Sequence, residues 1–130
     1  MGTLPRFWWI PFGKVPEVNA SDLAKALRSD VPPQILDVRT RMEYRNGHIE
    51  GAMHVPIFEL RSRVNALPFD REKRVVTICL SAHRSIPAVR LLNEHGFKEV
   101  CQLAGGMIEW RKQGLPTLEE GADPDHPKKD

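Results

Sequence analysis

The alternation of short apolar runs with segments of helical periodicity is the feature that most constrains the fold. Residues 74–78 form the most β-prone window of the chain, and the segment that follows, up to Gly96, has apolar residues at helical spacing. The same alternation recurs along the chain and predicts an α/β domain with a mostly parallel sheet. We predict strands over residues 35–38, 51–55, 74–78 and 99–103, and helices over residues 21–29, 41–46, 57–67, 85–95 and 107–112.

Length and composition agree with one folded unit. The chain has 130 residues, of which 41% are hydrophobic and 28% charged, as in an ordinary soluble globular domain. Its net charge of +2 gives no electrostatic reason to expect nucleic acid as a partner. The acidic end of the sequence leaves residues 1–118 mildly basic, which suits small anions. The apolar N-terminal run is too short for an export signal or a membrane span.

The two ends of the sequence differ from its middle. Residues 1–16 show neither periodicity and are expected to form an irregular arm, whereas residues 118–130 are expected to be a disordered tail. The folded domain would then span residues 17–117. The aromatic stretch at 7–12 could cover the apolar surface of its own domain, a second copy or a membrane interface, and packing on its own domain is the preferred interpretation.

The chain contains two cysteines, Cys79 and Cys101. Two are too few for a disulfide framework, and their spacing does not fit a zinc or thioredoxin-like motif. They favour reduced thiols and a cytoplasmic protein. Cys101 falls within a predicted strand and is expected to be a small core residue.

Cys79 has a different setting, because it ends the most β-prone strand and a helix is predicted to begin six residues later. The intervening loop can turn backbone N–H groups toward the sulfur, and the helix N-terminus favours the nucleophilic thiolate. Arg84 closes this loop and offers a positive fork that could bind an oxyanion. The alternative is a buried structural thiol followed by a surface arginine, which the position between strand and helix makes the weaker interpretation.

Three segments of the sequence together resemble one known family. Cys79-Leu80-Ser81-Ala82-His83-Arg84-Ser85 resembles the active-site loop of rhodanese-like domains. Leu36-Asp37-Val38-Arg39, followed by Glu43, resembles the family's N-terminal signature, and Leu103-Ala104-Gly105-Gly106 its C-terminal one. The resemblance covers residues 17–117. It implies a single rhodanese-like domain, α/β in class, with a central, mostly parallel five-stranded sheet flanked by helices.

The resemblance also implies a function. Rhodanese-type enzymes are thiosulfate sulfurtransferases, and here Cys79 would be the catalytic residue that carries sulfur as a covalent persulfide, with no other cofactor. The donor would be a small anion such as thiosulfate, and the acceptor cyanide, a small thiol or a protein thiol. Asp37, Arg39 and Glu43 would support the loop. A binding module that carries sulfur or senses oxidants on Cys79 without turnover is the competing function. The residues implied to bind the substrate are Leu80, Ser81, Ala82, His83, Arg84 and Ser85.

Two details of the loop bear on this resemblance. Ala82 stands where the family usually has glycine, so the loop is either strained at a positive φ or follows another path, and we expect the loop shape to be preserved. Four residues separate Cys79 from Arg84, and Ile78 precedes the cysteine. The related phosphatases have a longer spacing and usually a histidine before the cysteine, so phosphatase activity is disfavoured.

The histidines suggest no metal site. His48 is expected to be a packed, hydrogen-bonded residue, with only His54 near it and no carboxylate set. His83 lies in the loop, where it could stabilise a thiolate or a leaving sulfite, although a solvated side chain is the preferred interpretation.

Overall fold

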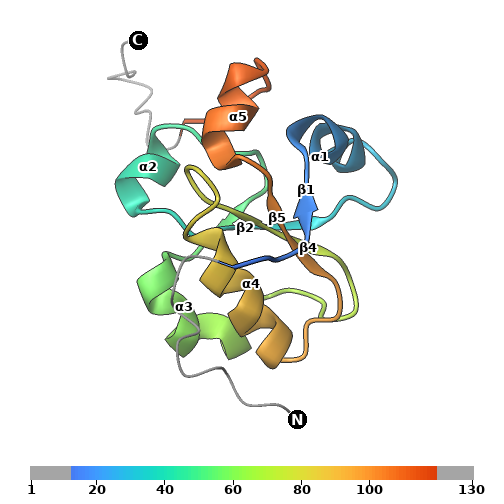
Figure 1. Ribbon diagram of the computed structural model, residues 1–130, viewed down its shortest axis with the longest axis vertical. Helices are drawn as coiled ribbons and strands as arrows, with labels where there is room; N and C mark the ends of the chain where they lie inside the picture. Colours follow the sequence, from blue (N-terminus) through green and yellow to red (C-terminus); the bar gives the residue numbers. More distant parts are fainter. Residues whose placement is uncertain (1–12, 120–130) are drawn as a thin grey trace.

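The computed structural model describes residues 13–119, so residues 1–12 of the predicted arm and 120–130 of the predicted tail lie outside the described residues. Within this range the chain forms a central parallel sheet with helices on both faces (Figure 1). The fold class predicted from the sequence is therefore confirmed.

The sheet has five strands in the order β1-β5-β4-β2-β3, and every pair of neighbours is parallel. The central strands β2, β4 and β5 are buried and have β-branched or other apolar residues on both faces, as expected for a sheet covered on both sides. The strands are β1 (Glu17–Val18), β2 (Gln34–Asp37), β3 (Met53–His54), β4 (Val75–Ile78) and β5 (Val100–Leu103).

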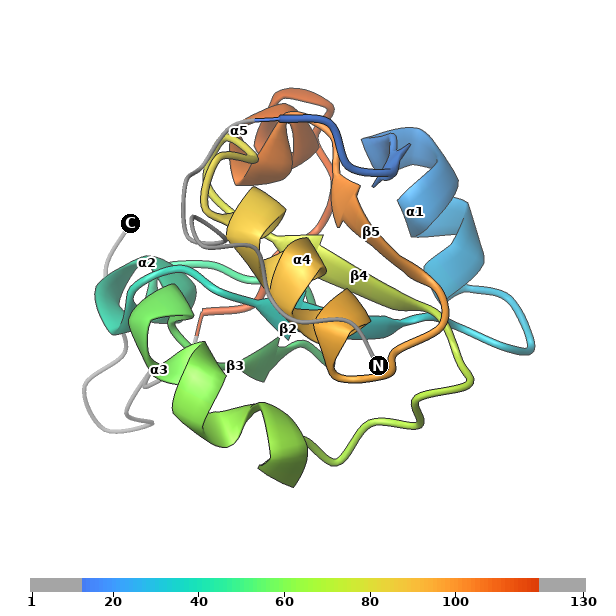
Figure 2. The ribbon, with the colours of Figure 1, turned by 60° about the horizontal axis from the view of Figure 1, so that its bottom comes forward.

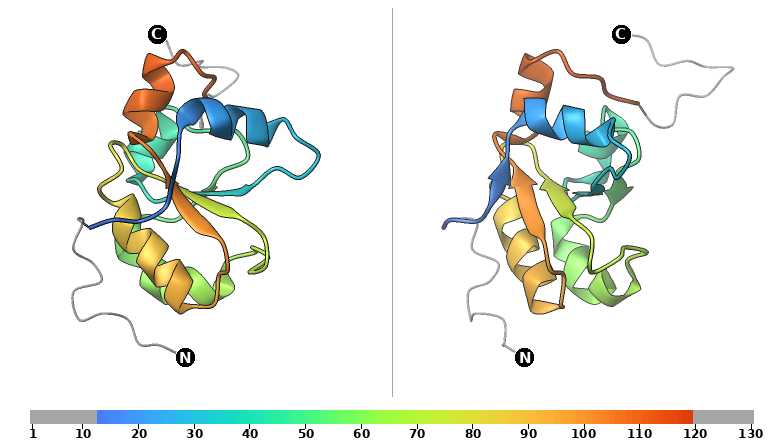
Figure 3. Two further views of the ribbon diagram at one scale, coloured as in Figure 1. Left: turned by 45° about the vertical axis from the view of Figure 1, so that its right-hand side comes forward. Right: turned by 90° about the vertical axis from the view of Figure 1, so that its right-hand side faces the viewer.

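Four of the five described α-helices cover the sheet, with α1 and α5 on one face and α3 and α4 on the other (Figures 2 and 3). The first face packs a cluster that includes Leu23, Ile78 and Trp110, and the second one that includes Leu60, Val89 and Leu92. The helices are α1 (Ala20–Leu27), α2 (Arg41–Arg45), α3 (Ile57–Arg63), α4 (Ser85–Glu94) and α5 (Gly106–Lys112).

Local sequence signals fix where two of these helices begin. The Asn19 side chain caps α1 by accepting a hydrogen bond of 2.8 Å from the backbone N–H of Asp22. Thr40 and Glu43 form a reciprocal capping box at the start of α2. The cap orients Glu43 in the first turn of α2, next to the loop that follows β4.

The structure differs from the sequence prediction in three elements. Strand β1 has only two residues, one of them charged, and was not predicted. The predicted helix over 57–67 ends at Arg63 and continues as a 3-10 turn over Val64–Ala66. The predicted strand over 51–55 is reduced to Met53–His54. These corrections are confined to the ends of elements and to one edge of the sheet.

Cys101 lies in the middle of β5, as predicted. Its side chain is buried in the cluster beneath α1 and α5, and this burial raises the pKa of the thiol. Within residues 13–119, no helix combines the length and apolar character needed to cross a lipid bilayer.

Candidate active site

The candidate site is the loop over residues 79–84, which connects β4 to α4 at the carboxyl edge of the sheet. Figure 1 shows it in yellow, with α2 on one side and α5 on the other. Cys79 is only 1% exposed, and its Sγ accepts a hydrogen bond of 3.2 Å from the backbone N–H of Arg84. The loop therefore curls back over the sulfur, and the first residues of α4 face it. The sequence predicted that N–H groups of the loop turn toward the sulfur, and the structure shows this for the N–H of Arg84.

Ala82 has a φ of 83° and is the one non-glycine residue with a positive φ among residues 13–119. An alanine in this conformation has its Cβ close to the backbone, which costs about 1–2 kcal/mol. The preserved loop shape expected from the sequence is thus confirmed at the residue that departs from the family pattern. The strain persists because both ends of the loop are fixed by other contacts.

Glu43 holds the end of the loop by a bidentate ion pair with Arg84. The two guanidinium Nη atoms donate hydrogen bonds of 2.7 and 2.8 Å to the two carboxylate oxygens. These bonds lower the pKa of Glu43 from 4.5 to about 2 and, together with the charge of Cys79, raise the pKa of Arg84. Arg84 closes the loop as predicted. Its second predicted role, binding an anionic donor, stays a prediction. In this structure both Nη atoms of Arg84 contact Glu43.

The first turn of α5 holds the loop from the other side. The backbone N–H groups of Met107 and Ile108 donate hydrogen bonds of 2.8 and 3.0 Å to the carbonyl oxygens of Cys79 and Leu80. This approach requires glycine at position 106, where a Cβ atom would lie 2.5 Å from both carbonyl oxygens. The two glycines belong to the motif that resembles the family's C-terminal signature, but the sequence did not predict this contact. The available signal was a glycine pair shortly after a strand.

Asp37 and Arg39 form a fully buried ion pair at the end of β2, with an Nη2 to Oδ2 distance of 2.7 Å. The same Nη2 atom also donates to the carbonyl oxygen of Gly47 at 2.9 Å. Of the three predicted supporting residues, Glu43 is the one with a hydrogen bond or ion pair to a described residue of the loop. Asp37 and Arg39 instead fix the connection between β2 and α2, on which Glu43 stands.

The remaining loop residues vary in exposure. Leu80 and Ser81 are partly exposed, whereas Ser85 is fully buried and its Oγ has no hydrogen-bond partner among the described residues. His83 is exposed, and its Nδ1 lies 3.0 Å from the Oγ of Ser81. The solvated position preferred for His83 is therefore confirmed.

The other described histidines have structural contacts. His48 is buried, stacks on Tyr44 with ring centroids 3.8 Å apart, and its Nδ1 lies 2.8 Å from the Tyr44 carbonyl oxygen. The predicted scaffold role of His48 is confirmed. His54 stacks on the same ring, and its Nε2 lies 2.8 Å from the carbonyl oxygen of Arg39. Within residues 13–119 there is no cluster of three histidine, cysteine or carboxylate side chains that could bind a metal ion.

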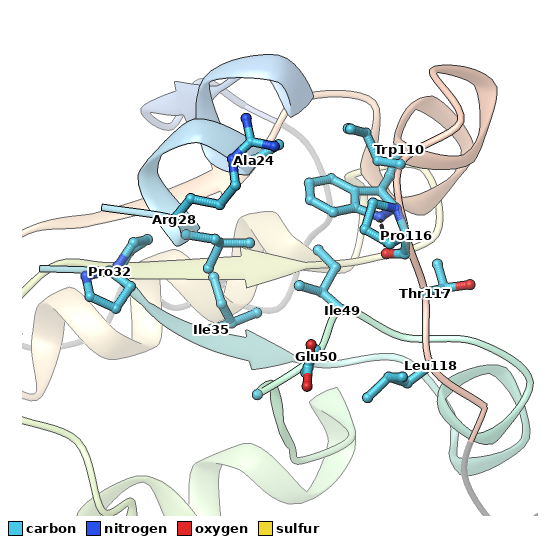
Figure 4. Close-up of a pocket in the computed structure, with 14 residues that line it drawn as sticks. Ala24, Arg28, Pro32, Ile35, Ile49, Glu50, Trp110, Pro116, Thr117 and Leu118 are labelled. Carbon is cyan, nitrogen blue, oxygen red and sulfur yellow. Dashed lines mark hydrogen bonds between the residues drawn. The ribbon is translucent and has the colours of Figure 1, made fainter. Parts of the chain in front are cut away.

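A separate groove of about 520 Å³ lies between α1, the start of β2 and the segment after α5 (Figure 4). Ala24, Ile35 and Ile49 give it an apolar lining, and the Trp110 indole N–H donates to the Pro116 carbonyl oxygen at its side. None of its lining residues belongs to the loop over 79–84. The groove therefore does not form part of the cysteine site.

Comparison with known proteins places this chain in a family. The Rhodanese-like domain profile matches residues 19–113. A sulfurtransferase from Allochromatium vinosum is 33% identical over 104 residues, which cover 80% of this chain and 95% of the relative. YrkF from Bacillus subtilis, named as a sulfur carrier protein, is 35% identical over 96 residues. That match covers 74% of this chain, which spans only about half (51%) of the length of YrkF.

A solved structure shows the same architecture. The crystal structure of a rhodanese-related protein from Thermoplasma volcanium superposes with a TM-score of 0.73 at 31% identity, covering 82% of this chain and 100% of that one. The region matched by the family profile contains the whole loop over 79–84 and the two helices that hold it, α2 and α5. The chain therefore belongs to the rhodanese-like domain family.

Proposed function

We propose that this chain is a sulfurtransferase that carries sulfane sulfur as a persulfide on Cys79. The observation that supports this most directly is the 3.2 Å hydrogen bond from the Arg84 backbone N–H to the Cys79 Sγ, at the N-terminus of α4. A donor to the sulfur and the positive end of a helix both stabilise a thiolate and, after sulfur is transferred, a persulfide anion.

The first half of the reaction uses thiosulfate as donor. The Cys79 thiolate attacks the outer sulfur of thiosulfate, so that a bond forms between Sγ and that sulfur. The bond to the sulfonate sulfur breaks, and its electron pair leaves with sulfite. One negative charge then resides on the outer sulfur of the persulfide. Because Cys79 is 1% exposed, the donor must reach Sγ inside the loop.

In the second half, an acceptor nucleophile attacks the outer sulfur. The bond between the two sulfurs breaks, the electron pair returns to Sγ as the thiolate, and the acceptor leaves as thiocyanate or as its own persulfide. No oxidant or reductant is consumed. The ion pair between Glu43 and Arg84 holds the end of the loop while the charge moves from Sγ to the outer sulfur.

The experiment is a steady-state assay of thiosulfate and cyanide turnover, with mass spectrometry of the protein after thiosulfate alone. Wild type should form thiocyanate and gain about 32 Da on Cys79, the mass of one sulfur. Cys79→Ser should lose both signals and keep the fold, because a hydroxyl is close in size but cannot form the persulfide. Cys101→Ser is the matched control and should keep turnover. Turnover of Cys79→Ser above background would refute the mechanism.

A sulfur carrier without turnover is the second candidate, favoured by the similarity to YrkF. It would give the persulfide mass on Cys79 in wild type but no repeated formation of thiocyanate. The same two measurements therefore separate the two functions.

A further inference from the structure

Three apolar side chains are exposed around the candidate site. Met42, Phe58 and Ile108 have exposed fractions of 75%, 78% and 53%. Each stands in the first turn of a helix, namely α2, α3 and α5, and each of these helices follows a strand of the parallel sheet. All three therefore lie at the carboxyl edge of the sheet, where the loop over 79–84 is also found (Figure 1). We call these three residues the apolar rim.

Contacts of these residues or of their chain neighbours link the three helices of the apolar rim to the carboxyl edge of the sheet. Met42 precedes Glu43, whose carboxylate binds Arg84. The backbone N–H of Ile108 donates to the carbonyl oxygen of Leu80. Phe58 follows Ile57, whose N–H donates to the carbonyl oxygen of Val38 at the end of β2. The three residues of the rim thus stand on helices that begin at the same edge of the sheet as the loop.

Positive charge lies beside the apolar rim. Arg41, Arg45 and Arg63 line a hollow of about 430 Å³, together with Tyr44 and His54. No carboxylate lines this hollow, and none of the three arginines forms an ion pair with a residue in the range 13–119. Arg41 and Arg45 belong to α2, as Met42 does, and Arg63 belongs to α3, as Phe58 does. Two helices of the rim therefore also line this hollow, which we call the arginine hollow.

We propose that the acceptor of the Cys79 persulfide is a protein whose reactive cysteine is flanked by apolar and acidic side chains. This proposal rests on the proposed function and specifies its acceptor. Cyanide or a small thiol is too small to contact three helices at once, whereas a protein surface can cover all three side chains and remove them from water. Carboxylates of the partner would complement the arginine hollow.

Burial of the nucleophile adds a geometric requirement on the partner. Cys79 is 1% exposed and lies inside its loop, so a flat surface could not bring a thiol to the persulfide. The acceptor cysteine must stand on a projecting turn or at the end of a chain. Its thiolate attacks the outer sulfur, the bond to Sγ breaks, and the persulfide passes to the partner as Sγ regains its negative charge.

The test measures single-turnover sulfur transfer from persulfidated protein to three acceptors. These are cyanide, glutathione and a synthetic peptide. The peptide has one central cysteine among leucine and glutamate residues, and its length of about 15 residues is enough to cross several helices. The rim variant combines Met42→Ser, Phe58→Ser and Ile108→Ser. The matched control combines Val31→Ser and Leu118→Ser, two other exposed apolar side chains, 73% and 46% exposed, outside the rim.

The rim variant should lose at least about tenfold in second-order rate toward the peptide, as expected when exposed anchors of a docking surface are removed. Its rate toward cyanide should stay within about twofold, because cyanide needs none of these contacts. The control should match wild type toward all acceptors. Replacing glutamate by lysine in the peptide should slow the transfer, and this slowing should shrink in Arg45→Gln/Arg63→Gln.

Equal peptide rates for the rim variant and the control would overturn the proposal. So would a rim variant that differs from wild type only in its oligomeric state by sedimentation, because the rim would then be covered by a second copy. Phe58→Ser alone keeps the test valid if the triple variant does not fold. If wild type transfers sulfur to no acceptor, cyanide included, the proposed function is refuted. The docking surface is then tested by measuring binding of the peptide with serine in place of its cysteine. Equal binding of this peptide by the rim variant and the control would overturn the proposed docking surface.

Discussion

Ala82 shows how one residue can report the shape of a loop. Its φ of 83° is a conformation that glycine adopts without steric cost, so Ala82→Gly relieves strain in the folded state. The same change adds conformational freedom to the unfolded chain, which costs about 0.4–1 kcal/mol. We expect the relief to equal or exceed this cost, so the free energy of unfolding should hold or rise by up to about 1 kcal/mol.

Denaturant melts of Ala82→Gly and wild type at equal m-value provide the measurement. Ala82→Val is the companion variant and should lose more than about 1 kcal/mol, because a β-branched side chain fits a positive φ poorly. A clear loss of stability in Ala82→Gly would mean that the loop in solution does not hold residue 82 at positive φ.

The residues of the site differ in how far the sequence could predict them. Cys79 and Arg84 follow from their positions after a strand and before a helix, together with the resemblance of the whole loop. Glu43, Asp37 and Arg39 were equivalent candidates, because the sequence does not show which carboxylate faces which arginine. Asp37 lies two residues from Arg39 and pairs with it locally, so only Glu43 is left to reach a partner 41 residues away.

At the scale of elements, the contact between α5 and the loop is the most sensitive to substitution. Gly106→Ala places a Cβ 2.5 Å from two carbonyl oxygens, at a residue whose φ is 58°. Backbone atoms cannot move aside as a flexible side chain can, so α5 or the loop must shift. We expect a loss of about 2–4 kcal/mol in the free energy of unfolding, together with slower persulfide formation on Cys79.

Gly114→Ala separates the two contributions. Gly114 also has a positive φ, 71°, but a Cβ there would have no atom within 4 Å. This variant should pay only the conformational cost of about 1 kcal/mol and form the persulfide at the wild-type rate. The measurement is urea unfolding of both variants. Equal losses of stability would show that the close approach of residue 106 to the loop adds nothing to the cost of replacing this glycine.

The elements themselves were largely predictable, since most of the helices and four of the five strands follow an apolar period bounded by proline, glycine or a capping residue. Strand β1 could not be predicted because two residues carry no periodicity. It pairs with β5 through the register of Glu17 with Gln102 and of Val18 with Leu103, which depends on the tertiary fold. Helix lengths were missed for a related reason, because the last turn after Arg63 tightens into a 3-10 helix without a change in the apolar pattern.

At the scale of the whole molecule, the strand order brings the beginnings of α2 and α4 together, although α2, β3, α3 and a 3-10 turn lie between β2 and β4 in the sequence. The ion pair between Glu43 and Arg84 joins these beginnings at the carboxyl edge. It is the one described ion pair between residues far apart in sequence whose partners are both less than one-third exposed. Its loss should therefore affect the stability of the domain as well as the loop.

The pH dependence of unfolding tests this connection. Hydrogen bonds from Arg84 lower the pKa of Glu43 from 4.5 to about 2, so the folded state binds this proton less readily than the unfolded state does. The pair's contribution is complete above about pH 4.5 and is lost as the pH falls toward 2. Glu43→Gln keeps the capping box with Thr40, since glutamine also serves at that position, and removes only the charge. We expect Glu43→Gln to be less stable than wild type at pH 7 by an amount on the order of 1 kcal/mol, because the pair is partly screened by solvent. The difference should shrink steadily between pH 4.5 and pH 2 in urea melts.

Glu99→Gln is the matched control, because Glu99 pairs with Arg74 at 3.7 Å and its side chain is 65% exposed. Its stability should parallel that of wild type at every pH. Parallel curves for Glu43→Gln and wild type would instead show that the carboxylate is not bound to Arg84 in solution, and the loop over 79–84 would then be held by α5 alone.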